Sequence, residues 1–358
     1  MTTPHVLEVA RFPTAGNVGV VAAPNGMARI VIIVNRRARR LAGETSARTL
    51  LDALRARRAG VRVVETHSMA DLDAAAEELA REVPDTIVLA GGDGSYMAGV
   101  TALVRSFAAA GRGEDALPPI ALAPGGTVST VARNWGFKGG GLFSGGEDKA
   151  ARYTMRLLDA ALRGRATITK RPTLRATDER SSRVGFIVGA GLVSRFFEVY
   201  DEEGERGYRG AASIVARIFA GSFTRGLLAQ RVLTPVACTI TVDGVVAPFD
   251  RTSLVCASVV RDLGIGMHLL YRAGEALDRF HVVATSLGPS RLGPQLPLVL
   301  AGRPLLGAGN VDTLAASVEL RFGGLEDDGD GAYVLDGELL RAERVVVTAG
   351  PVLRIVSV

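Results

Sequence analysis

Apolar residues in the first part of the chain form short continuous runs that alternate with stretches of helical spacing. Three such runs cover residues 28–35, 61–65 and 86–90. Each has the length and composition of a strand buried on both faces. Between them, apolar residues recur every three or four positions over 45–59 and 72–83. Alternating strands and helices predict a mostly parallel α/β sheet with helices on its faces, covering residues 28–160.

The pattern changes after about residue 160, where short β-like runs follow one another between Gly, Pro and Asp turns. This spacing predicts an antiparallel all-β sandwich or barrel over residues 161–358. The stretch 206–228 mixes apolar residues with arginines. It predicts either a basic amphipathic helix at a membrane surface or a helix packed on the sandwich. Residues 1–27 are rich in Gly, Pro and Ala without a clear period, and they predict a loose N-terminal arm.

A glycine-rich turn directly follows the strand predicted at 86–90. Gly91, Gly92 and Gly94 leave backbone N–H groups uncovered, and the next segment can start a helix whose N-terminus carries partial positive charge. This arrangement is typical of a phosphate-binding loop. Asp93 within it has two candidate roles, coordination of Mg²⁺ or acceptance of a proton from an attacking hydroxyl. An Asp-Gly pair also occurs in ordinary turns.

A second glycine-rich turn, Pro124-Gly125-Gly126-Thr127, follows the strand predicted at 119–123. In a parallel α/β sheet, ligands bind beyond the carboxyl ends of the strands, so both turns are expected at the same edge. The Thr127 hydroxyl has two compatible uses, a hydrogen bond to a phosphate oxygen and the cap of the following helix. The two turns together predict a site for a phosphorylated ligand.

Composition and charge narrow the class of protein. The 358 residues are 47% hydrophobic and carry a formal net charge of +5, which suits a globular protein large enough for two domains. Cys238, Cys256 and the four scattered histidines have neither zinc-site spacing nor a disulfide framework, so a reduced cytoplasmic setting is expected. No run is apolar enough to span a bilayer. The basic run at 36–40 lacks the interleaved aromatics typical of nucleic-acid binding, so no nucleic-acid partner is expected.

The order of five short motifs resembles the diacylglycerol kinase catalytic-domain family, which includes bacterial lipid kinases, sphingosine kinases and ceramide kinases. The motifs are Asn35, Thr66, Gly-Gly-Asp-Gly at 91–94, Pro-Gly-Gly-Thr at 124–127 and Asp-Gly-Glu at 336–338. The resemblance extends over nearly the whole chain after residue 28. It implies an N-terminal α/β domain like that of NAD kinase and phosphofructokinase, a C-terminal β-sandwich, and ATP in the cleft between them.

The resemblance also implies roles for individual residues by their position. Asp93 is expected to serve the phosphate and metal chemistry. Asp336 is expected to bring a carboxylate from the second domain to the cleft, with Glu338 as the candidate base for a lipid hydroxyl. Asp93 and Glu338 therefore compete for the role of base. The residues expected to bind the nucleotide are Asn35, Thr66, Gly91, Gly92, Gly94, Ser95, Gly125, Gly126, Thr127 and Asp336.

Departures from the family concern the metal and the acceptor. Glu275 stands where family members often have the aspartate of an Asp-Gly-Leu motif that binds a structural Mg²⁺, so a metal ligand is expected there. Gly126-Thr127 is followed by Val-Ser-Thr where the family usually has Gly-Asn-Asp, and 189–194 lacks the aspartate of Gly-x-Gly-x-Asp. These changes lie near the expected acceptor position, and they leave room for a sphingoid or ceramide acceptor beside diacylglycerol.

The resemblance thus implies an ATP- and Mg²⁺-dependent lipid kinase that transfers the γ-phosphoryl group to a primary hydroxyl of a membrane lipid. Such an enzyme is expected to be cytoplasmic and peripheral at the inner face of the membrane. Its oligomeric state is left open, with a homodimer as one option. Two alternatives also stay open. One is a soluble kinase resembling phosphofructokinase or NAD kinase, and the other is an inactive lipid-binding protein on the same fold.

Overall fold

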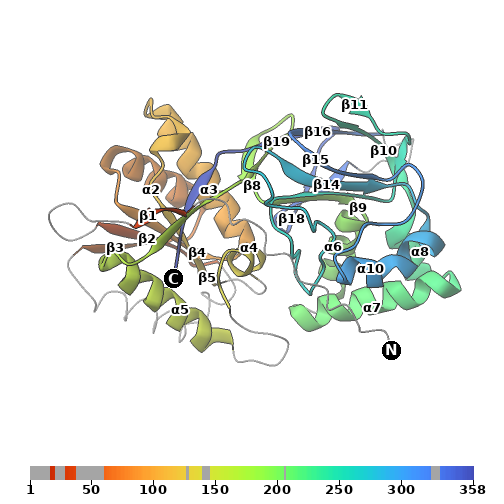
Figure 1. Cartoon of the computed structure of the whole chain (residues 1–358), viewed down its shortest axis with the longest axis horizontal. Helices are drawn as coiled ribbons and strands as arrows, with labels where there is room; N and C mark the ends of the chain where they lie inside the picture. The colour runs from red at the N-terminus through yellow and green to blue at the C-terminus, as the bar shows by residue number, and fades with distance from the viewer. Residues whose placement is uncertain are drawn as a thin grey trace, which may run out of the picture.

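The apolar runs of the N-terminal part form parallel neighbours in one sheet (Figure 1). The computed structural model describes residues 17–20, 29–37, 60–125, 129–138, 146–204, 207–323 and 331–358. Four strands follow the order β5-β4-β2-β3 in this first sheet. They are β2 (Ile30–Asn35), β3 (Val61–Thr66), β4 (Thr86–Gly91) and β5 (Ile120–Pro124). All neighbouring pairs among them are parallel, so the predicted parallel α/β sheet is confirmed.

Helices cover both faces of the first sheet. In Figure 1, α2 (Met69–Glu82) and α3 (Asp93–Ala109) lie on one face, and α5 (Gly146–Leu162) lies on the other. The α2 helix begins at Ser68, whose hydroxyl accepts from Asp71 N, while the Asp71 carboxylate accepts from Ser68 N. Two shorter elements are η1 (Glu114–Ala116) and α4 (Thr130–Asn134). The helix predicted at 45–59 lies outside the described residues.

The first sheet also contains three strands that the sequence pattern did not assign to it. They are β1 (Asn17–Val20), β6 (Thr167–Arg171) and β20 (Leu353–Ser357). β20 is parallel to β5 and antiparallel to β6, and β6 in turn pairs with β1. Part of the N-terminal arm predicted at 1–27 is therefore a strand. The first and last strands of the region predicted as a separate domain at 161–358 likewise complete the first sheet.

Two antiparallel sheets form the β-rich part. The second sheet runs β11-β10-β16-β19-β7-β8, with β12 also paired to β10, and the third runs β15-β14-β13-β9-β17-β18. The second-sheet strands are β7 (Leu174–Thr177), β8 (Ser182–Gly185), β10 (Val236–Val242), β11 (Val245–Val246), β12 (Arg251–Thr252), β16 (Ser317–Phe322) and β19 (Arg344–Ala349). The third-sheet strands are β9 (Ile187–Gly191), β13 (Leu254–Ser258), β14 (Phe280–Thr285), β15 (Val311–Ala315), β17 (Ala332–Leu335) and β18 (Glu338–Arg341). Val255 and Val282 of the third sheet share one buried core with Ile240 and Leu320 of the second, so the predicted all-β architecture is confirmed.

A layer of helices covers the outer face of the third sheet. It comprises α6 (Leu192–Glu203), α7 (Tyr208–Thr224), α8 (Leu227–Leu233), α9 (Pro289–Leu292), η2 (Gly293–Gln295) and α10 (Leu296–Leu300). Ile214 and Ile218 of α7 are buried with Cys256 of β13 and Val283 of β14. Within the stretch predicted at 206–228, α7 is thus a helix packed on the β-rich part, and it belongs to a third layer that the strand pattern did not predict.

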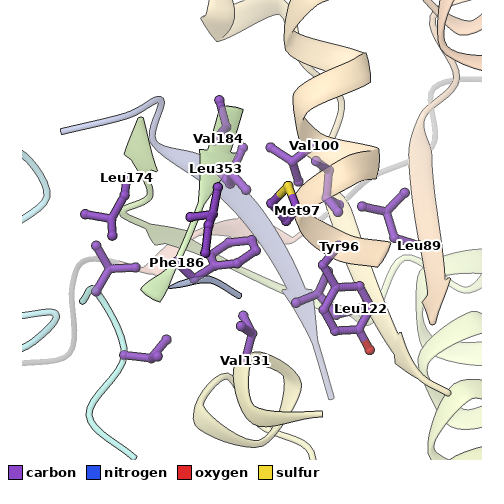
Figure 2. Packing of buried hydrophobic residues seen from close by; sticks show 14 of the residues in the cluster. Leu89, Tyr96, Met97, Val100, Leu122, Val131, Leu174, Val184, Phe186 and Leu353 are labelled. Atoms are coloured by element: carbon purple, nitrogen blue, oxygen red, sulfur yellow. The ribbon is translucent and has the colours of Figure 1, made fainter. Parts of the chain in front are cut away.

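The two halves of the molecule share a continuous core around α3. Figure 2 shows Met97 and Val100 of α3 beside Val184 of β8 and Leu353 of β20. The Thr101 hydroxyl also accepts from Val184 N at 2.9 Å and donates to Val184 O at 3.3 Å, which fixes α3 to the edge of the second sheet. The helix that begins at the first glycine turn is therefore anchored in both halves.

Candidate active site

The carboxyl ends of the parallel strands bring most of the predicted nucleotide residues to one edge of the first sheet. Asn35 at the end of β2 lies beside Thr66 at the end of β3. Gly91 at the end of β4 lies beside Pro124 at the end of β5. Gly125 N donates to Gly91 O at 2.7 Å, which joins the two glycine turns. This edge of a parallel sheet is where ligands of such folds bind.

The first glycine turn is held by the Ser95 hydroxyl. Ser95 Oγ accepts from Gly92 N at 3.3 Å and from Asn35 Nδ2 at 2.8 Å. A Cβ at Gly91 would lie 2.4 Å from Ser95 Cβ, so no side chain fits there. The turn opens directly into α3, and the first backbone N–H groups of that helix provide partial positive charge. The geometry suits a bound phosphate group.

A cavity of about 100 Å³ lies beside this turn. Its polar lining comes from Asn35, Arg37, Thr66, His67 and Ser95. Its remaining walls are mostly apolar residues of β2, α2, β4 and α3. Its volume is smaller than that of a typical ligand pocket, but its apolar walls, few polar groups and place at the end of parallel strands suit one part of a small-molecule site. Residues 126–128, which include Gly126 and Thr127, lie outside the described residues.

Asp93 is partly buried and its two carboxylate oxygens face the start of α4. Oδ2 accepts from Thr130 N at 2.8 Å, and Oδ1 accepts from Val131 N at 2.9 Å. Burial raises the pKa of Asp93, while these two hydrogen bonds act in the opposite direction. Asp93 therefore fixes the helix that follows the second glycine turn. The sequence pattern gave no indication of this contact.

The Asp-Gly-Glu motif forms the turn between β17 and β18 and places Glu338 over the start of α3. Asp336 and Gly337 both have positive φ, 49° and 87°, as a tight two-residue hairpin requires. A Cβ at Gly94 would lie 3.0 Å from Glu338 Oε1, so the glycine leaves space for this carboxylate. The structure thus brings the second predicted carboxylate motif to the first glycine turn.

Asp336 lies beneath the same turn and holds β17 to the segment before β9. Its buried carboxylate accepts from Phe186 N at 3.0 Å and from Ile187 N at 2.9 Å. Burial raises the pKa of Asp336 well above its usual range, and repulsion from Asp93 and Glu338 adds to the effect. Asp336 is therefore placed to position Glu338 rather than to reach the nucleotide.

The Glu338 carboxylate is the candidate proton acceptor of the cleft. Glu338 is an exposed residue, but desolvation of its carboxylate over the start of α3 raises its pKa, and the positive charge of Arg183 on β8 partly offsets the increase. A raised pKa makes a carboxylate a better proton acceptor. Arg183 was not predicted as a site residue, because no spacing in the sequence relates it to the Asp-Gly-Glu motif.

Glu275 lies apart from these residues, in the loop between β13 and β14. Its exposed carboxylate accepts from Arg272 Nε at 3.2 Å. In the part of the chain that the structure describes, no group of three or more His, Cys, Asp or Glu residues could hold a metal ion. The surroundings of Glu275 therefore do not fit the oxygen cage of a structural Mg²⁺.

A cluster of aromatic rings on α6 was also missed by the sequence analysis. Phe196 and Phe197 have ring centroids 5.7 Å apart, and the Tyr200 ring stacks on Phe196 at 6.1 Å. Phe197 comes within 3.8 Å of the position that a Cβ on Gly337 would take. The cluster therefore begins next to Glu338 and continues along α6 as a half-buried apolar row, with Phe196 and Tyr200 packed against the core of the helical layer.

Comparisons with known proteins agree with the motifs. The model of the diacylglycerol kinase catalytic domain matches residues 29–153. No curated protein matches the chain at a significant level. A crystal structure of a diacylglycerol kinase from Bacillus anthracis str. Sterne has a TM-score of 0.61 at 17% identity, covering 94% of this chain and 99% of that chain. Another structure from that organism, provisionally assigned the same activity, has a TM-score of 0.57 at 16% identity, covering 93% and 98%. A yeast NADH kinase complexed with NADH has a TM-score of 0.46 at 13% identity, covering 96% and 90%.

A parallel sheet with two glycine turns at its carboxyl edge, closed by a carboxylate from a β-rich region, defines a two-part phosphotransferase. The match over residues 29–153 identifies this part as a diacylglycerol kinase catalytic domain, so the predicted family is confirmed. The family match thus covers residues 29–153, and the two solved structures share the fold of the chain over more than nine tenths of its length.

Proposed function

We propose that the protein transfers the γ-phosphoryl group of ATP to a primary hydroxyl of a membrane lipid, a ceramide or sphingoid lipid or a diacylglycerol. The observation that carries this proposal is the position of Glu338 Oε1 against Gly94, at the first turn of α3. A phosphate held by the N–H groups of that turn would lie next to a carboxylate with a raised pKa. This is the juxtaposition that phosphoryl transfer to a hydroxyl needs.

The nucleotide is assigned to the cavity between β2, β4 and α3. Asn35 and Ser95 already share a hydrogen bond, and their polar atoms line this cavity with Thr66. The N–H groups that follow Gly92, at the start of α3, are the donors for the phosphate chain. Mg²⁺ bound to ATP would neutralise phosphate charge, and Asp93 would supply the oxygen atoms that such an ion prefers.

The proton of the lipid hydroxyl is assigned to Glu338 and not to Asp93. Both Asp93 oxygens already accept backbone hydrogen bonds from α4, whereas Glu338 faces the turn itself. Asp336 acts as a positioning residue, because its two backbone hydrogen bonds hold the hairpin that carries Glu338. Transfer would then proceed by positioning and charge neutralisation, with the proton passing to the Glu338 carboxylate.

The acceptor chain is assigned to the aromatic cluster of α6. Phe196, Phe197 and Tyr200 form an apolar row that starts beside Gly337. A lipid with its hydroxyl at Glu338 could lay its hydrocarbon part along these rings. The missing Asn and Asp after Thr127 favour an acceptor other than diacylglycerol, so ceramide and sphingoid lipids belong in the first assay.

Access to such an acceptor requires contact with a membrane surface. No helix in the described residues is long and apolar enough to cross a membrane. We therefore propose peripheral contact at the inner face of the membrane, where cytoplasmic ATP is available.

The deciding experiment measures transfer from labelled ATP with Mg²⁺ to diacylglycerol, sphingosine and ceramide in mixed micelles. Fructose 6-phosphate and NAD serve as soluble acceptors in parallel. Transfer to one lipid supports the proposal and identifies the acceptor. Transfer only to a soluble acceptor would overturn the lipid assignment, and an absence of transfer combined with lipid binding would favour the inactive lipid-binding protein.

A further inference from the structure

Large apolar side chains are exposed together on the helical layer of the β-rich part. Phe223 at the end of α7 is 62% exposed, and Leu227 at the start of α8 is 89% exposed. Leu300 at the end of α10 is 46% exposed, and Leu306 just beyond it is 67% exposed. We call these four residues and the exposed arginines beside them the docking surface. Such a concentration of apolar tips on one layer indicates an interaction site.

The two segments that carry these residues are packed against each other. A Cβ at Gly293 of η2 would lie 2.2 Å from Ser222 Cβ, so η2 lies directly against the end of α7 next to Phe223. The Gln295 side chain then donates to Leu306 O at 2.9 Å and accepts from Leu306 N at 2.7 Å. These contacts connect Phe223 and Leu306 through η2, and Figure 1 shows α7, α8 and α10 in the same layer.

The charge of the same segments is uniformly positive. Residues 207–235 and 286–310 contain six arginines and no Asp or Glu. Arg217 and Arg231 form ion pairs with α6, with Glu203 and Glu202 respectively. Arg209 lies in the first turn of α7. The remaining three are exposed arginines of the docking surface, Arg225, Arg291 and Arg303. Within the described part of the chain, none of these three forms an ion pair. Apolar tips among unpaired arginines are complementary to the headgroups and acyl boundary of an anionic bilayer.

We propose that this docking surface binds the anionic surface of a lipid bilayer and delivers the acceptor along α6. The proposal rests on the proposed function, because it supplies the lipid partner of the same site. Gly207 N donates to Tyr200 Oη at 2.6 Å, so α7 begins at the far end of the aromatic cluster that starts beside Glu338. The docking surface and the candidate base are therefore connected by α6 and α7.

The test is co-sedimentation of the full chain with vesicles of phosphatidylcholine alone and with phosphatidylglycerol added. We expect binding only to the anionic vesicles, and weaker binding at high salt. The double variant Phe223→Ser and Leu227→Ser should lose at least about tenfold in vesicle affinity, because two apolar anchors are removed. Its matched control is Val245→Ser with Val246→Ser, an exposed apolar pair on the β11 hairpin, which should bind like the unmodified protein.

Charge is tested separately by Arg225→Glu combined with Arg291→Glu. Each arginine near an anionic surface contributes about fivefold in affinity, so reversal of two should reduce binding by at least about 25-fold. Arg112→Glu, an exposed arginine of the first half, is the control and should leave binding unchanged. Equal binding by all variants would overturn the proposal. A failure of the unmodified protein to bind anionic vesicles would also overturn it. So would analytical ultracentrifugation that shows the docking surface to be buried between two copies of the chain.

A further measurement distinguishes bilayer docking from phosphoryl transfer itself. Transfer to a short-chain lipid that is monomeric in water needs no bilayer, so the surface variants should retain it within about twofold while losing transfer to lipid in anionic vesicles. Loss of both activities in folded surface variants would contradict a docking role. If no acceptor is phosphorylated but vesicle binding still depends on the docking surface, the proposed function fails and the docking surface stands.

Discussion

Two Asp-Gly hairpins in the described part of the chain have nearly the same backbone and very different surroundings. Asp243-Gly244 joins β10 to β11 with φ values of 46° and 83°, and Asp336-Gly337 joins β17 to β18 with φ values of 49° and 87°. In both turns the aspartate accepts backbone N–H groups of a neighbouring segment. Turn chemistry alone therefore does not distinguish the hairpin that carries the candidate base, Glu338, from the hairpin at Asp243.

The difference lies in what each hairpin faces. Asp243 is solvent-accessible and also pairs with Arg279, and Val245 after the turn points into solvent. Asp336 is buried, and Glu338 after its turn lies over Gly94 at the start of α3. The same local structure becomes a candidate catalytic element only where the fold carries it to the glycine turn.

The largest expected effect comes from the residue that follows each turn. Glu338→Gln should reduce kcat by roughly 10²–10⁴-fold, because the amide cannot accept the hydroxyl proton. Val245→Gln, at the matching position of the other hairpin, should leave kcat unchanged. Steady-state kinetics with the identified lipid would measure both, and thermal unfolding should give similar midpoints. A folded Glu338→Gln protein with normal kcat would contradict the assignment of the base.

The two aspartates should differ in their contribution to stability. Asp336→Ala leaves two buried N–H groups without an acceptor, so the free energy of unfolding should fall by about 2–4 kcal/mol. Asp243→Ala exposes its donors to water and should lower it by less than about 1 kcal/mol. Urea denaturation measures both values. Equal losses would show that burial of Asp336 does not control the hairpin.

The two glycines provide a smaller test in which the stability effects should match. Gly337→Ala and Gly244→Ala each place a Cβ at positive φ, and each should lower the free energy of unfolding by about 1 kcal/mol. Only Gly337→Ala should also reduce kcat, because a shifted turn moves Glu338. An equal effect of both variants on kcat would contradict a positional role for the Asp336-Gly337 turn.

The smallest expected effect is a shift in pH dependence. Desolvation raises the folded-state pKa of Glu338 and Arg183 lowers it, so Arg183→Met should raise this pKa further. Activity requires the ionised base, and kcat/KM should therefore decline at a higher pH as the solution is made acidic. Arg341→Met, on the same hairpin but paired with Glu198, is the control. An unchanged acidic limb in Arg183→Met would indicate that another group titrates.

Much of the fold around the candidate site could be predicted from local sequence. The apolar runs of β2 and β4, the capping box at Ser68 and the glycine turn after β4 follow from rules that act over a few residues. The Asp-Gly-Glu motif could be related to the cleft only through the family resemblance. The turn residues of Asp243-Gly244 and Asp336-Gly337 are identical, so the local sequence does not show which turn reaches α3.

The features that were missed depend on contacts between distant segments. The Asp93 contact with α4 depends on how two turns meet, and Arg183 approaches Glu338 only because β8 packs on α3. β6 and β20 resemble the strands of the β-rich part, and only pairing with β5 assigns them to the first sheet. Periodicity indicates that a segment is a strand, but it does not indicate which sheet receives it.

The position of β20 also determines the order in which the protein can be assembled during synthesis. β5 and β6 belong to one sheet, but β20 fills the place between them. Every strand of the second and third sheets is made before β20 is available. The first sheet therefore cannot be completed while its N-terminal strands emerge from the ribosome. Its completion depends on the late, long-range pairing of β20 with β5 and β6, and pairing of this kind slows folding. Both halves of the cleft should consequently become functional together.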